Sequence, residues 1–158
     1  MDETMQVKAN DTSGAADGSE RIVVVGVDGS PESNTALAWA AEEARIRGAT
    51  LRVVHSWTIP TWSYSAYLPP GAFDEVAPAA AADLDRQLAE VLGTTPSVPV
   101  EKQVREGPAA EQILEAAKDA ALVVVGSRGR GGFSGLLLGS VSAQVAQHAH
   151  CPVTIVRS

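Results

Sequence analysis

The sequence predicts an α/β protein built on a doubly wound, open parallel five-stranded sheet with helices on both faces. Short apolar runs such as RIVVVGV at 21–27 and LVVV at 122–125 have the continuous hydrophobicity of parallel strands that are covered on both sides. These runs alternate with segments whose apolar residues recur at helical spacing. The alternation indicates right-handed crossovers that place helices on either side of the sheet.

The expected elements follow one another in a regular β-α order. They are strand 21–27, helix 31–48, strand 51–55, helix 74–92, strand 98–104, helix 108–117, strand 122–125, helix 140–145 and strand 152–156. Ser30 and Pro31 are the expected N-cap and first-turn residue of the first helix, and Gly48 is its expected end. Ser140 can cap the last helix, or its hydroxyl can bind phosphate. In such sheets ligands bind at the carboxyl ends of the strands, so the loops after strands one and four are the candidates.

Composition excludes several classes of protein. A net charge of −7 argues against general affinity for DNA or RNA, which depends on Lys and Arg that neutralise phosphates. No apolar run approaches the roughly 18 residues of a membrane helix, and the acidic, polar residues 1–20 differ from a signal peptide. We therefore expect a cytoplasmic protein without nucleic-acid or membrane partners, with a disordered tail at 1–20 and a single domain at 21–158.

Cysteine and histidine do not form a catalytic or metal-binding pattern. The single cysteine, Cys151, cannot form an internal disulfide, and three histidines with one cysteine do not make a metal triad. His55 ends an apolar strand and is expected to be a packing residue, while His148 and His150 lie near the C-terminus of the last helix. We predict no catalytic residue and no metal ligand.

An irregular stretch at 57–73 contains two of the three tryptophans, both tyrosines and three of the nine prolines. A loop of this length is commonly functional, so the aromatic side chains could cover a ligand or form a partner surface. They could equally pack against the domain's own helices, because aromatic residues bury large areas wherever they lie. Both interpretations stay open.

Five glycines lie within ten residues, from Gly126 to 135, between an apolar strand and a helix. Successive backbone N–H groups in such a segment can cradle phosphate oxygens, and the helix that begins beyond Gly139 adds the positive end of its dipole. Arg128 and Arg130 supply formal charge. The spacing matches neither a P-loop, which needs Gly-Lys-Ser/Thr, nor the dinucleotide fingerprint after the first strand. A mobile surface loop is the alternative.

The pattern Gly126-x2-Gly129-x9-Gly139-Ser140 resembles the nucleotide motif of single-domain, bacterial universal stress proteins of the ATP-binding type. The resemblance extends from Arg21 to Arg157 and includes VGVDGS at 25–30, VVH at 53–55 and CPVTIV at 151–156. It implies a strand order of 3-2-1-4-5, ATP bound where strands one and four diverge, and a homodimer paired through the last strand. The apolar last strand would otherwise leave an unpaired edge.

The resemblance also implies a set of nucleotide-binding residues. They are Gly26, Val27, Asp28, Ser56, Gly126, Ser127, Arg128, Gly129, Arg130, Gly131, Gly132, Gly139, Ser140 and Val141. Gly26 and Val27 would line the base pocket, with Ser56 contributing from the second strand. The Asp28 carboxylate would repel phosphates but can accept hydrogen bonds from ribose hydroxyls or the adenine amine. Its alternative role is to cap the following helix.

The resemblance favours a nucleotide-responsive regulatory protein of the stress response that binds ATP, with Mg²⁺ as an accompanying ion. Its ligand would change a dimer contact or the surface offered to an unidentified protein partner. Asp28 is the only obvious acid near the glycines, so the carboxylates that phosphoryl transfer usually needs are not evident. A slow or autophosphorylating ATPase and a protein that binds AMP or cyclic AMP remain the alternatives.

Overall fold

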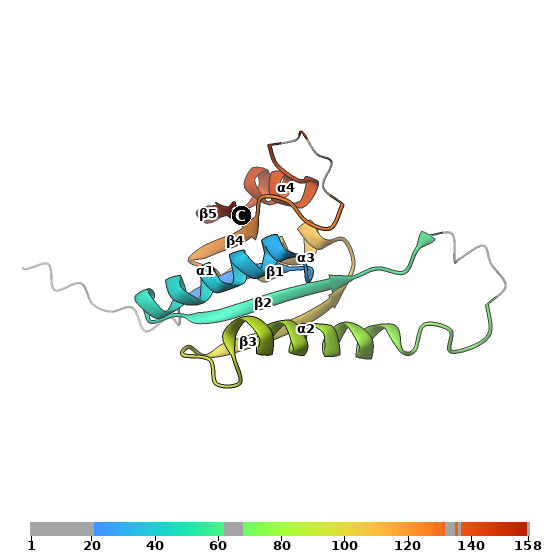
Figure 1. Cartoon of the computed structure of the whole chain (residues 1–158). Coiled ribbons are helices and arrows are strands. Elements are labelled where there is room, and N and C mark those ends of the chain that lie inside the picture. Colours follow the sequence, from blue (N-terminus) through green and yellow to red (C-terminus); the bar gives the residue numbers. More distant parts are fainter. Residues whose placement is uncertain (1–20, 62–67, 132–134, 136, 158) are drawn as a thin grey trace, which may run out of the picture.

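The computed structural model describes residues 21–61, 68–131, 135 and 137–157, which form one parallel sheet with helices on both faces (Figure 1). The predicted tail at 1–20 lies outside the described residues. The sheet has five strands in the order β3-β2-β1-β4-β5, which confirms the predicted fold and strand order. The elements are β1 Ile22–Val27, α1 Pro31–Arg47, β2 Thr50–Trp57, α2 Val76–Leu92, β3 Val100–Glu106, α3 Ala109–Ala116, β4 Leu122–Gly126, α4 Ser140–His148 and β5 Val153–Val156.

Two apolar cores lie on opposite faces of the sheet because successive strand side chains point to opposite sides. Val23 and Val25 of β1 pack with residues of α1 and α2, such as Leu37 and Leu84. Val24, between them, packs on the other face with α3 and α4. Strands buried on both faces explain why their sequences read as continuous valine runs.

Helix α1 begins and ends as its sequence predicts. The Ser30 hydroxyl accepts a hydrogen bond from the Ser33 amide at 3.2 Å, so Ser30 is the N-cap. Gly48 adopts a left-handed conformation, with φ 59°, and its amide donates to carbonyls of the last turn. A left-handed C-terminal residue favours glycine because a Cβ would clash with the backbone there.

Helix α4 begins differently from the prediction. Ser140 is its first helical residue, and the N-cap is Gly139, which has extended backbone angles and no side-chain cap bond. The Gly139 carbonyl accepts the first helical hydrogen bond, from Ala143. The prediction that Ser140 caps this helix was therefore wrong by one residue. A capping serine and a first-turn serine look alike in sequence, and only the preceding backbone angles separate them.

Part of the predicted aromatic segment is strand. β2 continues to Trp57, two residues beyond the predicted end, because Ser56 and Trp57 pair with Arg105 and Glu106 of β3. Residues 62–67, which include the second tryptophan and both tyrosines of the segment, lie outside the described residues. The choice between a lid and a packing role therefore stays a prediction.

The strand order reverses its direction of growth at β1, which pairs with β2 on one side and with β4 on the other. The carboxyl ends of β1 and β4 therefore lie side by side. One polypeptide turn leaves toward α1 and the other toward α4, and the divergence opens a crevice between them. This position defines the candidate site. Within the part of the chain that the structure describes, no helix is long and apolar enough to cross a bilayer.

Candidate functional site

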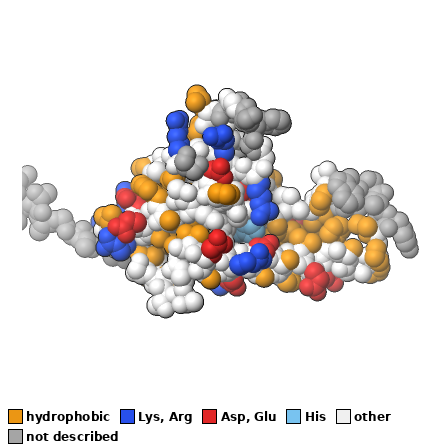
Figure 2. Space-filling model, in the orientation of Figure 1, with side chains coloured by type: hydrophobic (Ala, Val, Ile, Leu, Met, Phe, Trp, Pro, Cys, Tyr) orange, Lys and Arg blue, Asp and Glu red, His pale blue; other side chains and the backbone are white. Residues whose placement is uncertain are grey.

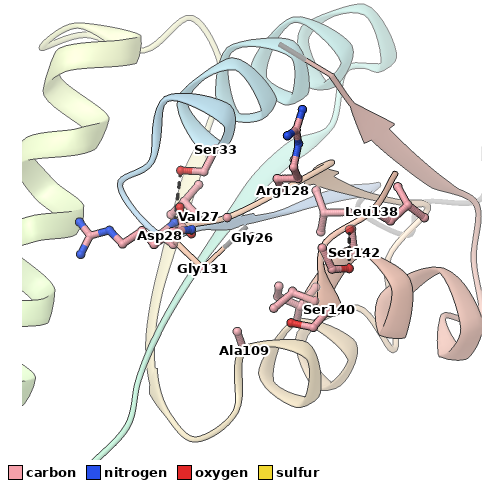
Figure 3. Close-up of a pocket in the computed structure, with 17 residues that line it drawn as sticks. Gly26, Val27, Asp28, Ser33, Ala109, Arg128, Gly131, Leu138, Ser140 and Ser142 are labelled. Atoms are coloured by element: carbon pink, nitrogen blue, oxygen red, sulfur yellow. Dashed lines mark hydrogen bonds between the residues drawn. The ribbon is translucent and has the colours of Figure 1, made fainter. Parts of the chain in front are cut away.

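A cavity of about 540 Å³ opens at the carboxyl ends of β1 and β4 (Figure 3). Its volume lies within the usual range for small-molecule sites. The lining comes from the turn after β1, from the N-terminal turns of α3 and α4, and from the chain between β4 and α4. We call this last stretch, from Gly126 to Gly139, the glycine segment. The residues are Gly26, Val27, Asp28, Ser33, Ala109, Ile113, Val125, Gly126, Arg128, Gly129, Arg130, Gly131, Leu138, Gly139, Ser140, Val141 and Ser142.

Asp28 joins the two sides of this cavity. Its Oδ1 accepts a hydrogen bond from the Ser30 amide at 2.9 Å, and its Oδ2 accepts one from the Arg130 amide at 3.0 Å. Its own amide donates to the Ser33 hydroxyl at 3.3 Å, drawn as a dashed line in Figure 3. Burial raises the pKa of this carboxyl, but hydrogen bonds from Ser30 and from the Arg130 amide outweigh burial and hold the pKa below its ordinary value. Asp28 is therefore a carboxylate at neutral pH.

The two ends of the glycine segment are tied together at the cavity floor. The Gly139 amide donates to the Ser127 carbonyl at 2.7 Å, and the Ser142 hydroxyl donates to the same carbonyl at 3.0 Å. The Ser127 amide in turn donates to the Val156 carbonyl of β5 at 2.8 Å. These bonds hold the chain as it leaves β4 against the start of α4.

Close packing explains two of the glycines. A Cβ on Gly126 would lie 3.2 Å from the Glu32 carbonyl oxygen. This oxygen belongs to the backbone of α1, which cannot easily move aside. A Cβ on Gly26 would overlap the end of the Ile113 side chain. Glycine at these positions lets α1 and the Ile113 side chain of α3 approach the strand ends. The cavity is shaped by this approach.

The start of α4 brings amides that lie outside the helix's own hydrogen-bond ladder to the cavity. The first intrahelical bond of α4 runs from Ala143 to Gly139, so the amides of Ser140, Val141 and Ser142 precede the intrahelical ladder. All three residues line the cavity. The N-terminus of a helix carries partial positive charge, which favours an anionic ligand.

Two arginines add formal positive charge at the rim of the cavity. Arg128 and Arg130 both line the cavity and are exposed. A Cβ on Gly29, which has φ 79°, would lie 2.8 Å from Nη2 of Arg130, so this side chain lies across the turn after β1. In Figure 3 the Arg128 side chain extends away from Ser140 and Ala109. The cavity thus combines one carboxylate with two guanidinium groups at its rim.

The opposite wall is apolar. Ala109 and Ile113 of α3 face the cavity, and Leu138 and Val141 close it near α4. Such a wall offers contact to a flat, weakly polar ring and nothing to a phosphate group. The cavity therefore has an apolar part beside the strand ends and a part rich in amides at the glycine segment.

Most of the predicted site residues line this cavity. Those that do are Gly26, Val27, Asp28, Gly126, Arg128, Gly129, Arg130, Gly131, Gly139, Ser140 and Val141. Ser127 is buried beneath it and contributes backbone bonds. Ser56 lies in β2, one residue beyond the last β1 pair, Val27 with His55, and does not line the cavity. Gly132 lies outside the described residues.

The lining includes six residues that the sequence did not single out. They are Ser33, Ala109, Ile113, Val125, Leu138 and Ser142. Ser33 lies one helical turn after Ser30 and was readable as part of that turn. Ala109 and Ile113 reach the cavity only because the α3 crossover returns over the strand ends, and no local motif signals this.

His55 has a structural partner at the same edge of the sheet. Its Nδ1 lies 3.0 Å from the Val27 carbonyl oxygen, to which it donates. The bond joins β2 to the end of β1 just before Asp28. Among the described residues, no group of three or more His, Cys, Asp or Glu side chains is placed to hold a metal ion. On the face shown in Figure 2, acidic and basic side chains of the described residues are interspersed.

Comparison with known proteins points to one family. The model of the universal stress protein family matches residues 20–157. A universal stress protein of Mycolicibacterium smegmatis is 42% identical over 151 residues, which are 90% of this chain and 48% of that protein. The chain spans about half the length of the curated relatives it matches.

Solved structures of the family share the fold. Universal stress protein UspA from Lactobacillus plantarum is 26% identical with a TM-score of 0.69, over 87% of this chain and 97% of that one. A universal stress protein described as a complex with cAMP is also 26% identical, with a TM-score of 0.65 over 86% of this chain and 96% of that one. Both are described as universal stress proteins, as is the curated relative.

Proposed function

This chain belongs to the universal stress protein family, and we propose that it binds an adenine nucleotide, ATP first among the candidates, in the cavity between β1 and β4. One observation carries the proposal. The cavity joins the Asp28 carboxylate to the Arg130 amide of the glycine segment, 102 residues away, beside the amides at the start of α4. An acceptor for hydroxyls and a set of donors for phosphates are thus placed in one cavity.

The nucleoside fits the side of the cavity formed by β1 and α3. Gly26 and Val27 with Ile113 offer the apolar contact that an adenine ring needs. Each carboxylate oxygen of Asp28 accepts one backbone hydrogen bond and keeps a second acceptor position for a ribose hydroxyl. A carboxylate belongs at this end of a nucleotide because it would repel the phosphates.

The phosphates fit the side formed by the glycine segment and α4. The amides of Ser140 and Val141 precede the helical hydrogen-bond ladder, and both residues line the cavity. Arg128 and Arg130 line the same cavity, and we infer that their exposed guanidinium groups turn toward a bound phosphate chain as charge-assisted donors. Two such side chains favour a nucleotide with more than one phosphate.

Binding rather than turnover is the function that these residues support. Asp28 is the one carboxylate among the described lining residues, and its oxygens already accept two amides. A Mg²⁺ ion that accompanies ATP would therefore be held by phosphate oxygens and water, which is its usual coordination. Among the lining residues that the structure describes, no second carboxylate or histidine is available to orient an attacking water. We propose a regulatory protein whose partner contacts respond to the bound nucleotide.

Cyclic AMP is the second candidate ligand. A family member with 26% identity is described as a complex with cAMP. In this chain, the apolar wall proposed for the adenine of ATP would also serve the adenine of cyclic AMP. A single phosphate would use the α4 amides and leave at least one arginine without a partner. We therefore rank it below ATP.

We further propose that the chain forms a homodimer through β5. This strand pairs with β4 on one side, and within the described residues no strand pairs with its other edge. All four of its residues, Val153–Val156, are partly exposed. An apolar edge of this kind is a template for pairing with a second strand. Sedimentation velocity that finds only monomer over a wide concentration range would contradict the dimer.

The nucleotide proposal is tested by what the protein carries when it is purified under native conditions. Mass spectrometry of the released small molecules should identify an adenine nucleotide. Added ATP at about 100 times its dissociation constant should stabilise the fold by about 2.7 kcal/mol, which is a rise of roughly 5–10 °C in the unfolding midpoint. An unchanged midpoint with millimolar ATP, AMP and cyclic AMP would contradict the proposal.

A further inference from the structure

A buried amide side chain connects α2 with α1. Gln87 is only 6% exposed, although it lies in a helix whose other polar residues are exposed. Its Nε2 group donates both hydrogens, to the Ser33 hydroxyl at 3.0 Å and to Asn34 Oδ1 at 2.6 Å. The surrounding contacts between the two helices come from the apolar core, which includes Leu84 and Leu88. A buried amide in such a setting is costly unless it is hydrogen-bonded, and both of these hydrogen bonds go to α1.

Ser33 uses its full hydrogen-bonding capacity. Its hydroxyl donates to the Ser30 carbonyl at 3.0 Å and accepts from Gln87 Nε2 and from the Asp28 amide, at 3.0 and 3.3 Å. A hydroxyl has one donor and two acceptor positions, so all three are filled. Ser33 is 4% exposed and lines the cavity. The orientation of its hydroxyl is therefore determined by its three partners together.

Asp28 continues the connection into the cavity. Its amide is held by Ser33, and its carboxylate is held by the amides of Ser30 and Arg130. A continuous chain of hydrogen bonds thus runs from Gln87 in α2 through Ser33 to Asp28 and the glycine segment. Gln87 itself does not line the cavity. Its position is nevertheless two hydrogen bonds away from the residue assigned to the nucleoside.

We propose that Gln87 is a positioning residue for the adenine-nucleotide site, acting through Ser33 to hold the backbone and carboxylate of Asp28 where they meet the nucleoside. This inference rests on the nucleotide-binding function proposed above. Gln87 does not line the cavity and acts on the nucleotide only through Ser33 and Asp28. By reciprocity, a nucleotide that bonds to Asp28 also stabilises the contact between α1 and α2.

A purely structural role for Gln87 makes a different prediction. If the amide only joins the two helices, its removal lowers stability and leaves nucleotide affinity unchanged. Gln87→Met keeps the length and volume of the side chain but cannot donate to Ser33. Leu88→Ala is the matched control, because it weakens the neighbouring position of α2, which belongs to the same core and has no hydrogen-bonding group.

The test is a double-mutant cycle on ATP affinity, measured by calorimetry on the folded full chain. Gln87→Met and Ser33→Ala should each raise the dissociation constant about three- to tenfold, which is the usual effect of one hydrogen bond. The double variant should be no weaker than Ser33→Ala alone, because both substitutions break the same connection. Leu88→Ala should lower the unfolding midpoint with unchanged affinity. Gln87→Asn, which keeps a polar group but is one methylene shorter, gives a second variant if Gln87→Met does not fold.

Three results would overturn the inference. Wild-type affinity in a folded Gln87→Met or Gln87→Asn variant would assign Gln87 to stability alone. Additive losses in the double variant would show that Gln87 does not act through Ser33. Failure of the wild-type chain to bind ATP, AMP or cyclic AMP would remove the proposed function and this inference with it, so the two failures are distinguished by the wild-type titration.

Discussion

Replacing Asp28 with asparagine tests which end of a nucleotide lies beside this side chain. Asp28→Asn keeps the shape of the side chain but removes its charge and leaves one acceptor oxygen where there were two. That oxygen can keep either the Ser30 amide, now at 2.9 Å, or the Arg130 amide, at 3.0 Å. The new NH₂ group then faces the other N–H, so one charge-assisted hydrogen bond is lost.

The magnitude follows from these bonds. One charge-assisted bond contributes about 1.5–3 kcal/mol, and partial exposure of the carboxylate places the expected loss of folding stability near the lower end, about 1–2 kcal/mol. If the ribose hydroxyls bind the carboxylate, ATP affinity falls by a similar energy, which is about five- to thirtyfold. If phosphates lie there instead, removing a negative charge raises the affinity. The two arrangements predict opposite signs.

The assay is isothermal titration calorimetry with ATP, accompanied by urea unfolding of the same samples. Glu32→Gln is the charge-matched control, because Glu32 lies in the first turn of α1 and its side chain does not line the cavity. This control should bind ATP within about twofold of the wild-type chain, since a partly exposed charge outside a site has a small effect. Tighter ATP binding by Asp28→Asn would refute the assignment of this residue to the nucleoside.

Three further substitutions or conditions have definite expected outcomes. The lowered pKa of Asp28 means that its ionised form adds stability fully above its ordinary pKa of 3.8, and that this stability is lost as the pH falls toward the folded value. The difference in unfolding free energy between wild-type and Asp28→Asn should therefore shrink in urea titrations from pH 6 down to about pH 3. Gly126→Ala should cost about 1 kcal/mol and weaken ATP binding because its Cβ would press on backbone, whereas Gly131→Ala, with open space around its Cβ, should be stable within about 0.5 kcal/mol. Arg52→Met should cost about 2 kcal/mol in thermal unfolding, because the 12% exposed Arg52 side chain donates to the Ala116 carbonyl at 2.7 Å and pairs with two acids; an unchanged midpoint would contradict this.

The sheet was predictable because its central strands, β1 and β4, are buried on both faces. Valine runs with no polar interruption, as in Ile22–Val27 and Leu122–Gly126, arise when α-helices cover both sides of a strand. The end of α1 was predictable because Gly48 occupies a left-handed position that other residues rarely adopt. The strand order came from the family motif and could not be derived from the alternation of strands and helices.

Boundaries that depend on tertiary contacts were less predictable. The extension of β2 to Trp57 needs the partner residues of β3, and the start of α4 depends on the backbone angles of Gly139. The glycine spacing drew attention to the residues that lie along the chain on either side of the cavity. It gave no signal for Ile113, whose side chain enters from another element.

Gln87 illustrates the same limit for a polar residue. In sequence it is one more polar position of an amphipathic helix, beside Arg86 and Glu90. Its burial and its hydrogen bonds follow from the contact between α1 and α2. Its partners Ser33 and Asn34 lie 54 and 53 residues away along the chain. A buried polar side chain can be recognised only when its partners are known.

The most direct test of the account is a calorimetric titration of the native chain with ATP, AMP and cyclic AMP. We expect saturable binding of one nucleotide per chain, with ATP the tightest and all three in mutual competition. Gly139→Val should abolish it, because a Cβ there would lie 3.4 Å from Arg128 Cα and 3.5 Å from the Ser127 carbonyl oxygen, and a branched side chain would push the start of α4 away from this backbone. The absence of binding by any of the three nucleotides at millimolar concentration, or equal binding by Gly139→Val, would contradict the central claim.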